Sequence, residues 1–161
     1  MSSEKSLLTL FNSQFFPYEN DEKEMISLAN TGDINGITLT KEDVTLIIQA
    51  KKNALAQTGR FEFGKSPYEM LLRAFADSPY ITSSDAGTVI AELIQTFYEL
   101  KNESDDAMTD EELTDKMKNT FNGAAAGSAK MLRDIIETEI RQERQINSAA
   151  DSFAYAEDEN D

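Results

Sequence analysis

The chain has 161 residues, with 15 Lys and Arg against 30 Asp and Glu, which gives a formal net charge of −15. It contains no His and no Cys, which excludes imidazole acid–base chemistry, thiol nucleophiles, disulfides and nearly every structural zinc or iron–sulfur site. Such an acidic chain would also repel nucleic acid, whose binding requires that its phosphates be neutralised.

Helical periodicity dominates the sequence from one end to the other. Two short amphipathic stretches, 6–16 and 20–31, come first. Thr40 then precedes Lys41 as a good N-cap, and Gly59 is placed to end the helix that follows. Residues 60–64 alternate like a strand, but one short strand has no partner, so we expect an extended connector there.

The rest of the chain predicts four further helices. Ser66 before Pro67, with Glu69, reads as a capping box for the first of them. Residues 84–102 carry the longest clean apolar stripe and are predicted to form the central helix. Thr109 with Glu112 forms another capping box, for a helix that stops at Gly123, and Ser128 caps the last helix.

These elements predict an all-α fold, a single compact domain of about six or seven helices, with the connector near residues 60–64 laid across the central helix. The domain is expected to span residues 1–146, and residues 147–161 to form an acidic, disordered tail. Aromatic side chains at helical spacing are expected in the core: Phe11, Phe15, Phe16, Phe75, Phe97, Tyr98 and Phe121.

Four landmarks in this order resemble an uncharacterised bacterial family, a domain of unknown function. They are GITLTKED at 36–43, TGRFEFG at 58–64, AFADSPYI at 74–81 and FYELKNE at 97–103. The resemblance runs from residue 20 to about residue 135 and implies no activity, cofactor or catalytic residue. Members of that family often carry a cysteine near the turn at 127–128, where this chain has alanines at 124–126.

Acidic residues on the last two helices suggest one enzymatic alternative, a Mg²⁺-dependent all-α hydrolase of phosphates or nucleotides. Paired acidic motifs on adjacent helices can hold Mg²⁺ without histidine. The candidate metal ligands are Glu111, Glu112, Asp115, Asp134 and Glu137. At 100° per residue both sets project away from the apolar faces of their helices, so first-turn capping explains them better. We therefore predict no metal, no cofactor and no catalytic residue.

The last helix carries the interaction candidates. Glu139 and Glu143 fall inside its apolar stripe. One explanation is that the helix outruns the domain near Ile140, so that Glu143 lies in water. The other is a partner surface, most simply the 129–146 helix of a second subunit in a homodimer. Phe153 and Tyr155 are an aromatic pair in the acidic tail that could dock onto a partner or back onto the body.

The residues favour a non-enzymatic interaction or regulatory module with a protein partner. The alternatives are the Mg²⁺-dependent hydrolase and an acidic mimic of nucleic acid that inhibits a basic protein, which the net charge suggests. The first residues lack the basic region and long apolar stretch of a signal peptide. No apolar run approaches the roughly 18 residues of a membrane span, so we expect a cytoplasmic protein that does not contact a membrane.

Overall fold

The computed structural model describes residues 37–62 and 66–158, with side chains as far as residue 154. Local capping signals mark both ends of its first helix. Helix α3 spans Lys41–Thr58. The Thr40 hydroxyl accepts a hydrogen bond from the backbone N–H of Asp43, whose carboxylate accepts one from the Thr40 N–H. Gly59 ends the helix in the left-handed conformation, at φ 65°. Both predicted caps are confirmed.

The capping box predicted from Ser66 and Glu69 is wrong. Helix α4 spans Tyr68–Phe75 and has no side-chain cap at its start. The Ser66 hydroxyl instead accepts a hydrogen bond of 3.1 Å from the ammonium of Lys51, on α3, and Glu69 pairs with Arg73 on its own helix. A buried lysine thus uses the hydroxyl that sequence spacing had assigned to the helix end.

The remaining helices are α5 at Ala86–Glu103, α6 at Asp110–Asn122 and α7 at Ala129–Asp158. The capping box of α6 is confirmed, since the Thr109 hydroxyl accepts from the Glu112 N–H and the Glu112 carboxylate accepts from the Thr109 N–H. Ser128 caps α7 by accepting from the Met131 N–H at 3.2 Å. The described residues form five helices and no strand, so the all-α class is confirmed.

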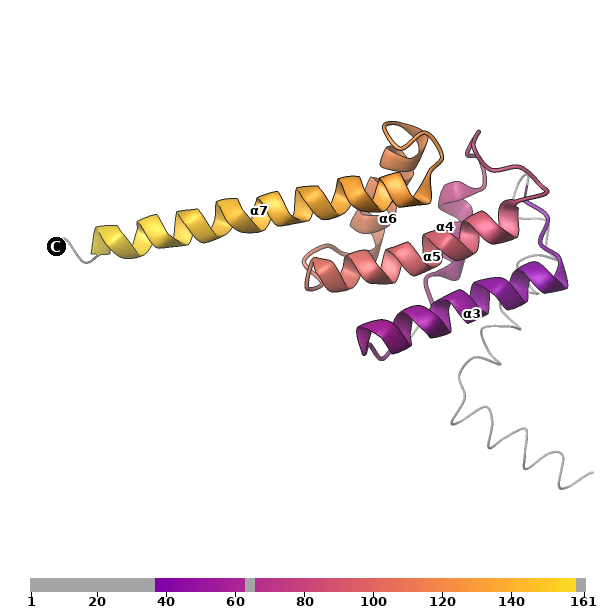
Figure 1. Cartoon of the computed structure of the whole chain (residues 1–161), viewed down its shortest axis with the longest axis horizontal. Coiled ribbons are helices and arrows are strands. Elements are labelled where there is room, and N and C mark those ends of the chain that lie inside the picture. The colour runs from indigo at the N-terminus through magenta and orange to yellow at the C-terminus, as the bar shows by residue number, and fades with distance from the viewer. Residues whose placement is uncertain (1–36, 63–65, 159–161) are drawn as a thin grey trace, which may run out of the picture.

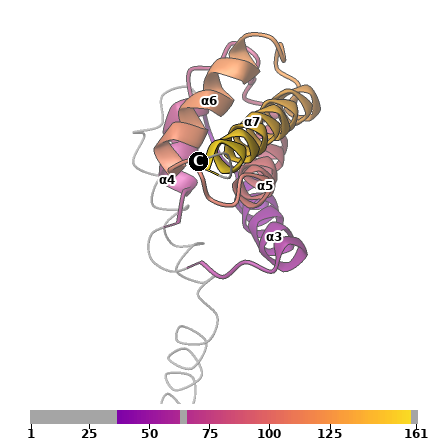
Figure 2. The same ribbon diagram turned by 90° about the vertical axis from the view of Figure 1, so that its left-hand side faces the viewer.

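The helices form two layers. Helices α3, α5 and α7 lie side by side and run in the same direction, while α4 and α6 cross one face of that layer (Figures 1 and 2). Within the described part of the chain, α5 contacts each of the other four helices, which confirms the prediction that it is central. The predicted helices at 6–16 and 20–31 lie outside the described residues.

The core lies between the two layers and is rich in aromatic side chains. Phe75 of α4 and Phe121 of α6 meet edge to face at 5.4 Å, and Phe97 packs against its neighbour Tyr98 in the same way. These four side chains are buried, as predicted. The other predicted core aromatics, Phe11, Phe15 and Phe16, lie outside the described residues.

Candidate functional site

The second half of α7 leaves the domain. Its first half packs on α5 and α6 through Leu132, Ile136 and Ile140, which are at most 5% exposed. From Arg141 to Ala154 every side chain is exposed. Residues 141–158, called the α7 extension below, project beyond the other helices (Figure 1), over roughly 27 Å at 1.5 Å per residue.

Two arginines fasten the base of the extension to the end of α5. The guanidinium of Arg144 donates to the Asp105 carboxylate at 2.8 Å and to the backbone carbonyl of Glu103. Arg141 donates to the Glu103 carboxylate at 3.4 Å. Asp105 is positioned for this by a left-handed backbone, at φ 51°, which aspartate tolerates better than most residues. Both arginines therefore point back towards the domain.

The face of the extension that points away from those arginines carries a row of apolar side chains. Ile146 is 68% and Phe153 74% exposed, and residues seven apart lie within about 20° of each other on a helix. Ala149 and Ala150 fill the turn between them and are also exposed. These four residues, the exposed stripe, form the longest uncovered apolar row on α7.

The two acidic interaction candidates lie next to this stripe. Glu139, within the domain, pairs with Lys116 of α6 at 2.7 Å. Glu143, one turn further on, is exposed in the extension. The helix therefore leaves the domain after Ile140, which is the geometry that the first sequence-based explanation predicted. A partner surface, the second explanation, stays a prediction.

The two positions of the tail's aromatic pair, 153 and 155, lie on different sides of the α7 backbone. Positions 153 and 155 both lie in α7, and residues two apart on a helix differ by about 200° in direction. Phe153 belongs to the exposed stripe, whereas Tyr155 occupies a position on another face. Residues 147–158 are helical in the structure; an isolated helix this short is marginally stable in water, so their mobility in solution stays a prediction.

Two of the acidic residues considered as metal ligands have other partners. Glu112 caps α6, and Glu137 pairs with Arg133 and Arg141 of its own helix. The others are Glu111, Asp115 and Asp134, all exposed. In the described part of the chain, no three Asp or Glu side chains come close enough together to hold a metal ion.

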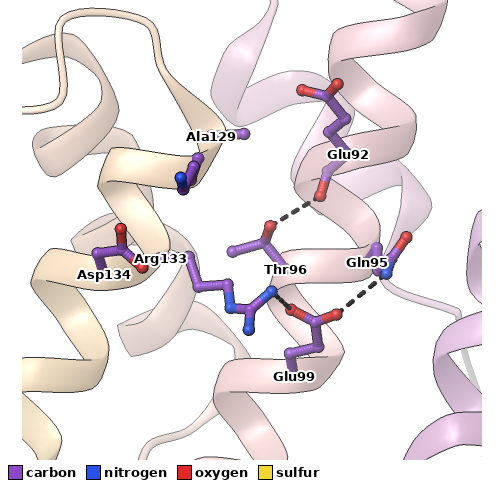
Figure 3. A pocket seen from close by; sticks show the side chains of 8 residues that line it. Glu92, Gln95, Thr96, Glu99, Ala129, Arg133 and Asp134 are labelled. Carbon is purple, nitrogen blue, oxygen red and sulfur yellow. Dashed lines mark hydrogen bonds and ion pairs between the residues drawn. The ribbon is translucent and has the colours of Figure 1, made fainter.

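A groove of about 350 Å³ runs between α5 and the start of α7 (Figure 3). Arg133 crosses it to Glu99 at 3.0 Å, and Gln95 donates to the same carboxylate at 3.0 Å. Hydrogen bonding to Glu137, together with the charge of Glu99, raises the pKa of the Arg133 guanidinium. Three of the side chains that line the groove, Gln95, Glu99 and Arg133, are therefore already paired with one another.

A second polar cluster joins residues 60–62 to α3 and α5. The buried ammonium of Lys51 pairs with Glu62, and the Tyr98 hydroxyl donates to the same carboxylate at 2.7 Å. Lys51 also lies 5.0 Å from the centre of the Tyr68 ring, within the range of a cation–π contact. Glu62 and Tyr98 thus hold residues 60–62 against α5.

The other half of this cluster lies at the end of α5. Arg60 donates to both carboxylate oxygens of Asp106, at 3.1 and 2.6 Å, and this pairing lowers the pKa of Asp106. Lys101 pairs with Asp110 at 2.9 Å and donates to the Met108 carbonyl at 2.9 Å. The Lys101 and Asp106 groups also border a hollow of about 190 Å³ beside Tyr98.

Sequence reasoning did not identify the two lysines of this cluster. The sequence pattern that could have identified them is a lysine at a position of the apolar stripe where a hydrophobic residue is expected. Lys51 lies four residues after Ile47 in α3, and Lys101 lies four residues after Phe97 in α5. Both are at most 9% exposed, and a buried ammonium needs a partner.

None of the helices in the described residues is long and apolar enough to cross a membrane. Comparison with curated proteins gave no match, and comparison with solved structures gave none either. One family model does match the sequence, over residues 24–149, which include the domain and the base of the α7 extension. The chain therefore belongs to a family of unknown function, DUF6323.

Proposed function

We propose that this protein is an interaction module whose contact surface is the exposed stripe of the α7 extension. The observation that carries the proposal is the combination of a helix that projects from its domain and large apolar side chains uncovered on it. Ile146 and Phe153 are each more than two-thirds exposed. Burying one such side chain contributes roughly 1.5–3 kcal/mol, so covering the row would stabilise both a complex and the helix that carries it.

The base of the extension supports the same function. Arg141 and Arg144 hold the first turn of the extension to α5, so the stripe is presented at a defined angle. A helix fixed at one end loses less conformational entropy on binding than a free segment does. The domain then acts as a rigid support for a short recognition helix.

The other polar clusters favour a structural role for the domain itself. The carboxylates of Glu62, Glu99 and Asp106 are each paired with a cation. A hydrolase would need carboxylates gathered around a metal ion and a substrate phosphate. The acidic mimic draws support from the net charge of −15, but a mimic does not require an exposed apolar row.

Several finer expectations belong to this proposal. We expect residues 6–16 and 20–31 to add two helices, giving six or seven in all, and residues 60–64 to form an extended connector. We expect the compact domain to span residues 1–146. We also expect a cytoplasmic location, since a chain without cysteine suits a reducing compartment.

Site-specific photo-crosslinking in the native cell tests the proposal. A photoreactive residue at position 150 lies on the exposed stripe, whereas one at position 148 points to about the opposite side of the same helix. Both positions are exposed. We expect a discrete crosslinked partner from position 150, lost when Phe153→Ala is added, and none from position 148. Equal crosslinking from both positions, or none from either, would refute the proposal.

A further inference from the structure

The charges around the exposed stripe indicate which kind of partner fits it. Among the described side chains of the extension, Glu143 is the charged residue within about 60° of the direction of Ile146. Glu139 lies in nearly the same direction, one turn before it, at the edge of the domain. Acids therefore border the apolar row where it meets the domain.

The cations of the extension lie on the other side of the helix. Arg141 and Arg144 are each about 140° or more away from the direction of Ile146. Both pair with acids at the end of α5, Arg141 with Glu103 and Arg144 with Asp105. Those contacts keep positive charge off the side of the helix that carries the stripe.

We infer that the exposed stripe binds an amphipathic helix of another protein, one that carries Lys or Arg beside its own apolar face. This inference rests on the proposed function and names the partner class. Two apolar anchors one heptad apart fit helix-against-helix recognition. Basic flanks on the partner complement Glu143 and the net charge of −15, which speeds encounter and excludes acidic competitors.

A second copy of this chain fits the same surface less well. Two copies meeting on their exposed stripes would each bring Glu143, and neither arginine of the extension, to the flank of the interface. The two chains would also approach with equal negative net charge. Like charges placed together disfavour the pairing.

Two model peptides of 18 residues test this inference on the full chain. Both carry leucine at the same helical spacing; one has lysine at all flanking positions and the other has glutamate. Binding of each labelled peptide is measured by fluorescence anisotropy at low and at high salt. We expect the leucine–lysine peptide to bind at least roughly tenfold more tightly at low salt, with a smaller difference at high salt.

Matched variants locate the binding surface. Phe153→Ala should weaken binding of the leucine–lysine peptide roughly tenfold, as for an apolar anchor, whereas Leu46→Ala on α3, which removes another exposed apolar side chain, should leave it unchanged. Glu143→Gln should weaken binding roughly two- to fivefold. Glu111→Gln, which removes an equal charge on α6, serves as the control for net charge.

Each other outcome overturns the inference. If Phe153→Ala and Leu46→Ala bind the basic peptide equally, or if wild type binds neither peptide, the stripe is not a site for a basic helix. A wild-type dimer in sedimentation that Phe153→Ala dissociates would show that a second copy occupies the stripe. In each of these cases a crosslink from position 150 would still support the proposed function. If position 150 gave no crosslink, the proposed function would be refuted as well.

Discussion

Gly87 allows α3 and α5 to approach closely at their first turns. A Cβ atom built on Gly87 would lie 2.1 Å from Oδ1, 2.4 Å from Cγ and 2.6 Å from Cβ of Asp43. Rotating the aspartate can move its carboxylate but not its Cβ, which is fixed to the α3 backbone. Reaching an ordinary contact of 3.4 Å would therefore require the two helices to separate locally by about 0.8 Å.

Three contributions set the cost of Gly87→Ala. Overpacking at a tight contact costs about 1–3 kcal/mol. Displacing the Asp43 carboxylate from the Thr40 N–H removes a cap worth about 1 kcal/mol. The higher helix propensity of alanine stabilises the helix by about 1 kcal/mol relative to glycine. We therefore expect a net loss of about 1–3 kcal/mol in the free energy of unfolding, and a fall in Tm of roughly 2–4 °C per kcal/mol.

Urea unfolding followed by circular dichroism measures this loss. Asp43→Ala should cost less in the Gly87→Ala background than in wild type, because the cap is already displaced there. Gly59→Ala is the control for backbone strain, since it has φ 65° but no atom within 4 Å of the added Cβ. If Gly87→Ala stabilises the protein by its helix propensity, the close approach of α3 to α5 is refuted.

Three further predictions concern the polar clusters and the extension. Arg60 lowers the pKa of the Asp106 carboxyl in the folded protein. The ion pair therefore stabilises the fold at pH values above the pKa that Asp106 has in the unfolded chain. This stabilisation is lost as the pH falls through the lower pKa that Asp106 has in the folded protein. Asp106→Asn should therefore lower the free energy of unfolding by at most about 1 kcal/mol at pH 7, because Asp106 is exposed. Urea titrations should show this loss shrinking as the pH falls. A difference between variant and wild type that stays constant with pH would contradict the prediction. Glu62→Gln should cost roughly 3 kcal/mol by leaving the buried Lys51 ammonium without its carboxylate, and a double variant with Lys51→Met should cost less than the sum, which a double-mutant cycle measures. Backbone amides of the α7 extension should exchange hydrogen much faster than those of the buried first half of α7, because the extension lacks tertiary burial; equal protection by mass spectrometry would disprove its independence.

Signals that act within a few residues were readable from the sequence. Thr40, Thr109 and Ser128 each bind a backbone N–H three residues away, so spacing alone is enough to identify them. The central position of α5 was likewise visible, because it carries the longest apolar stripe in the sequence. The all-α class follows from such local patterns.

Contacts between distant residues were not readable in this way. Ser66 was assigned to a local cap, yet its hydroxyl is bound by Lys51, 15 residues earlier. The partner of Arg60 is Asp106, 46 residues later, and no spacing in the sequence indicates that pair. Selecting among many acids in an acidic chain requires the tertiary arrangement.

The length of α7 was underestimated for a different reason. Polar and small residues after Asn147 suggested a disordered tail, because they offer little surface to bury. The sequence contains no glycine or proline after Gly127, so no residue there ends a helix. The lack of a helix-ending residue indicates that α7 continues, whereas the prediction of a tail relied on how little surface these residues can bury.

The shared direction of α3 and α5 also orders the charges of this molecule. Peptide dipoles in parallel helices add, so one end of the layer is partly positive and the other partly negative. Acids occupy the first end, where Asp43 and Asp85 stand at the helix starts. Arg60, Lys101 and Arg144 lie at the other end, each paired with an acid there, and Arg144 donates directly to a terminal carbonyl of α5. A chain with twice as many acids as bases thus places three of its cations where the backbone itself is negative. Replacing one of them with an acid would both break an ion pair and oppose the backbone dipoles.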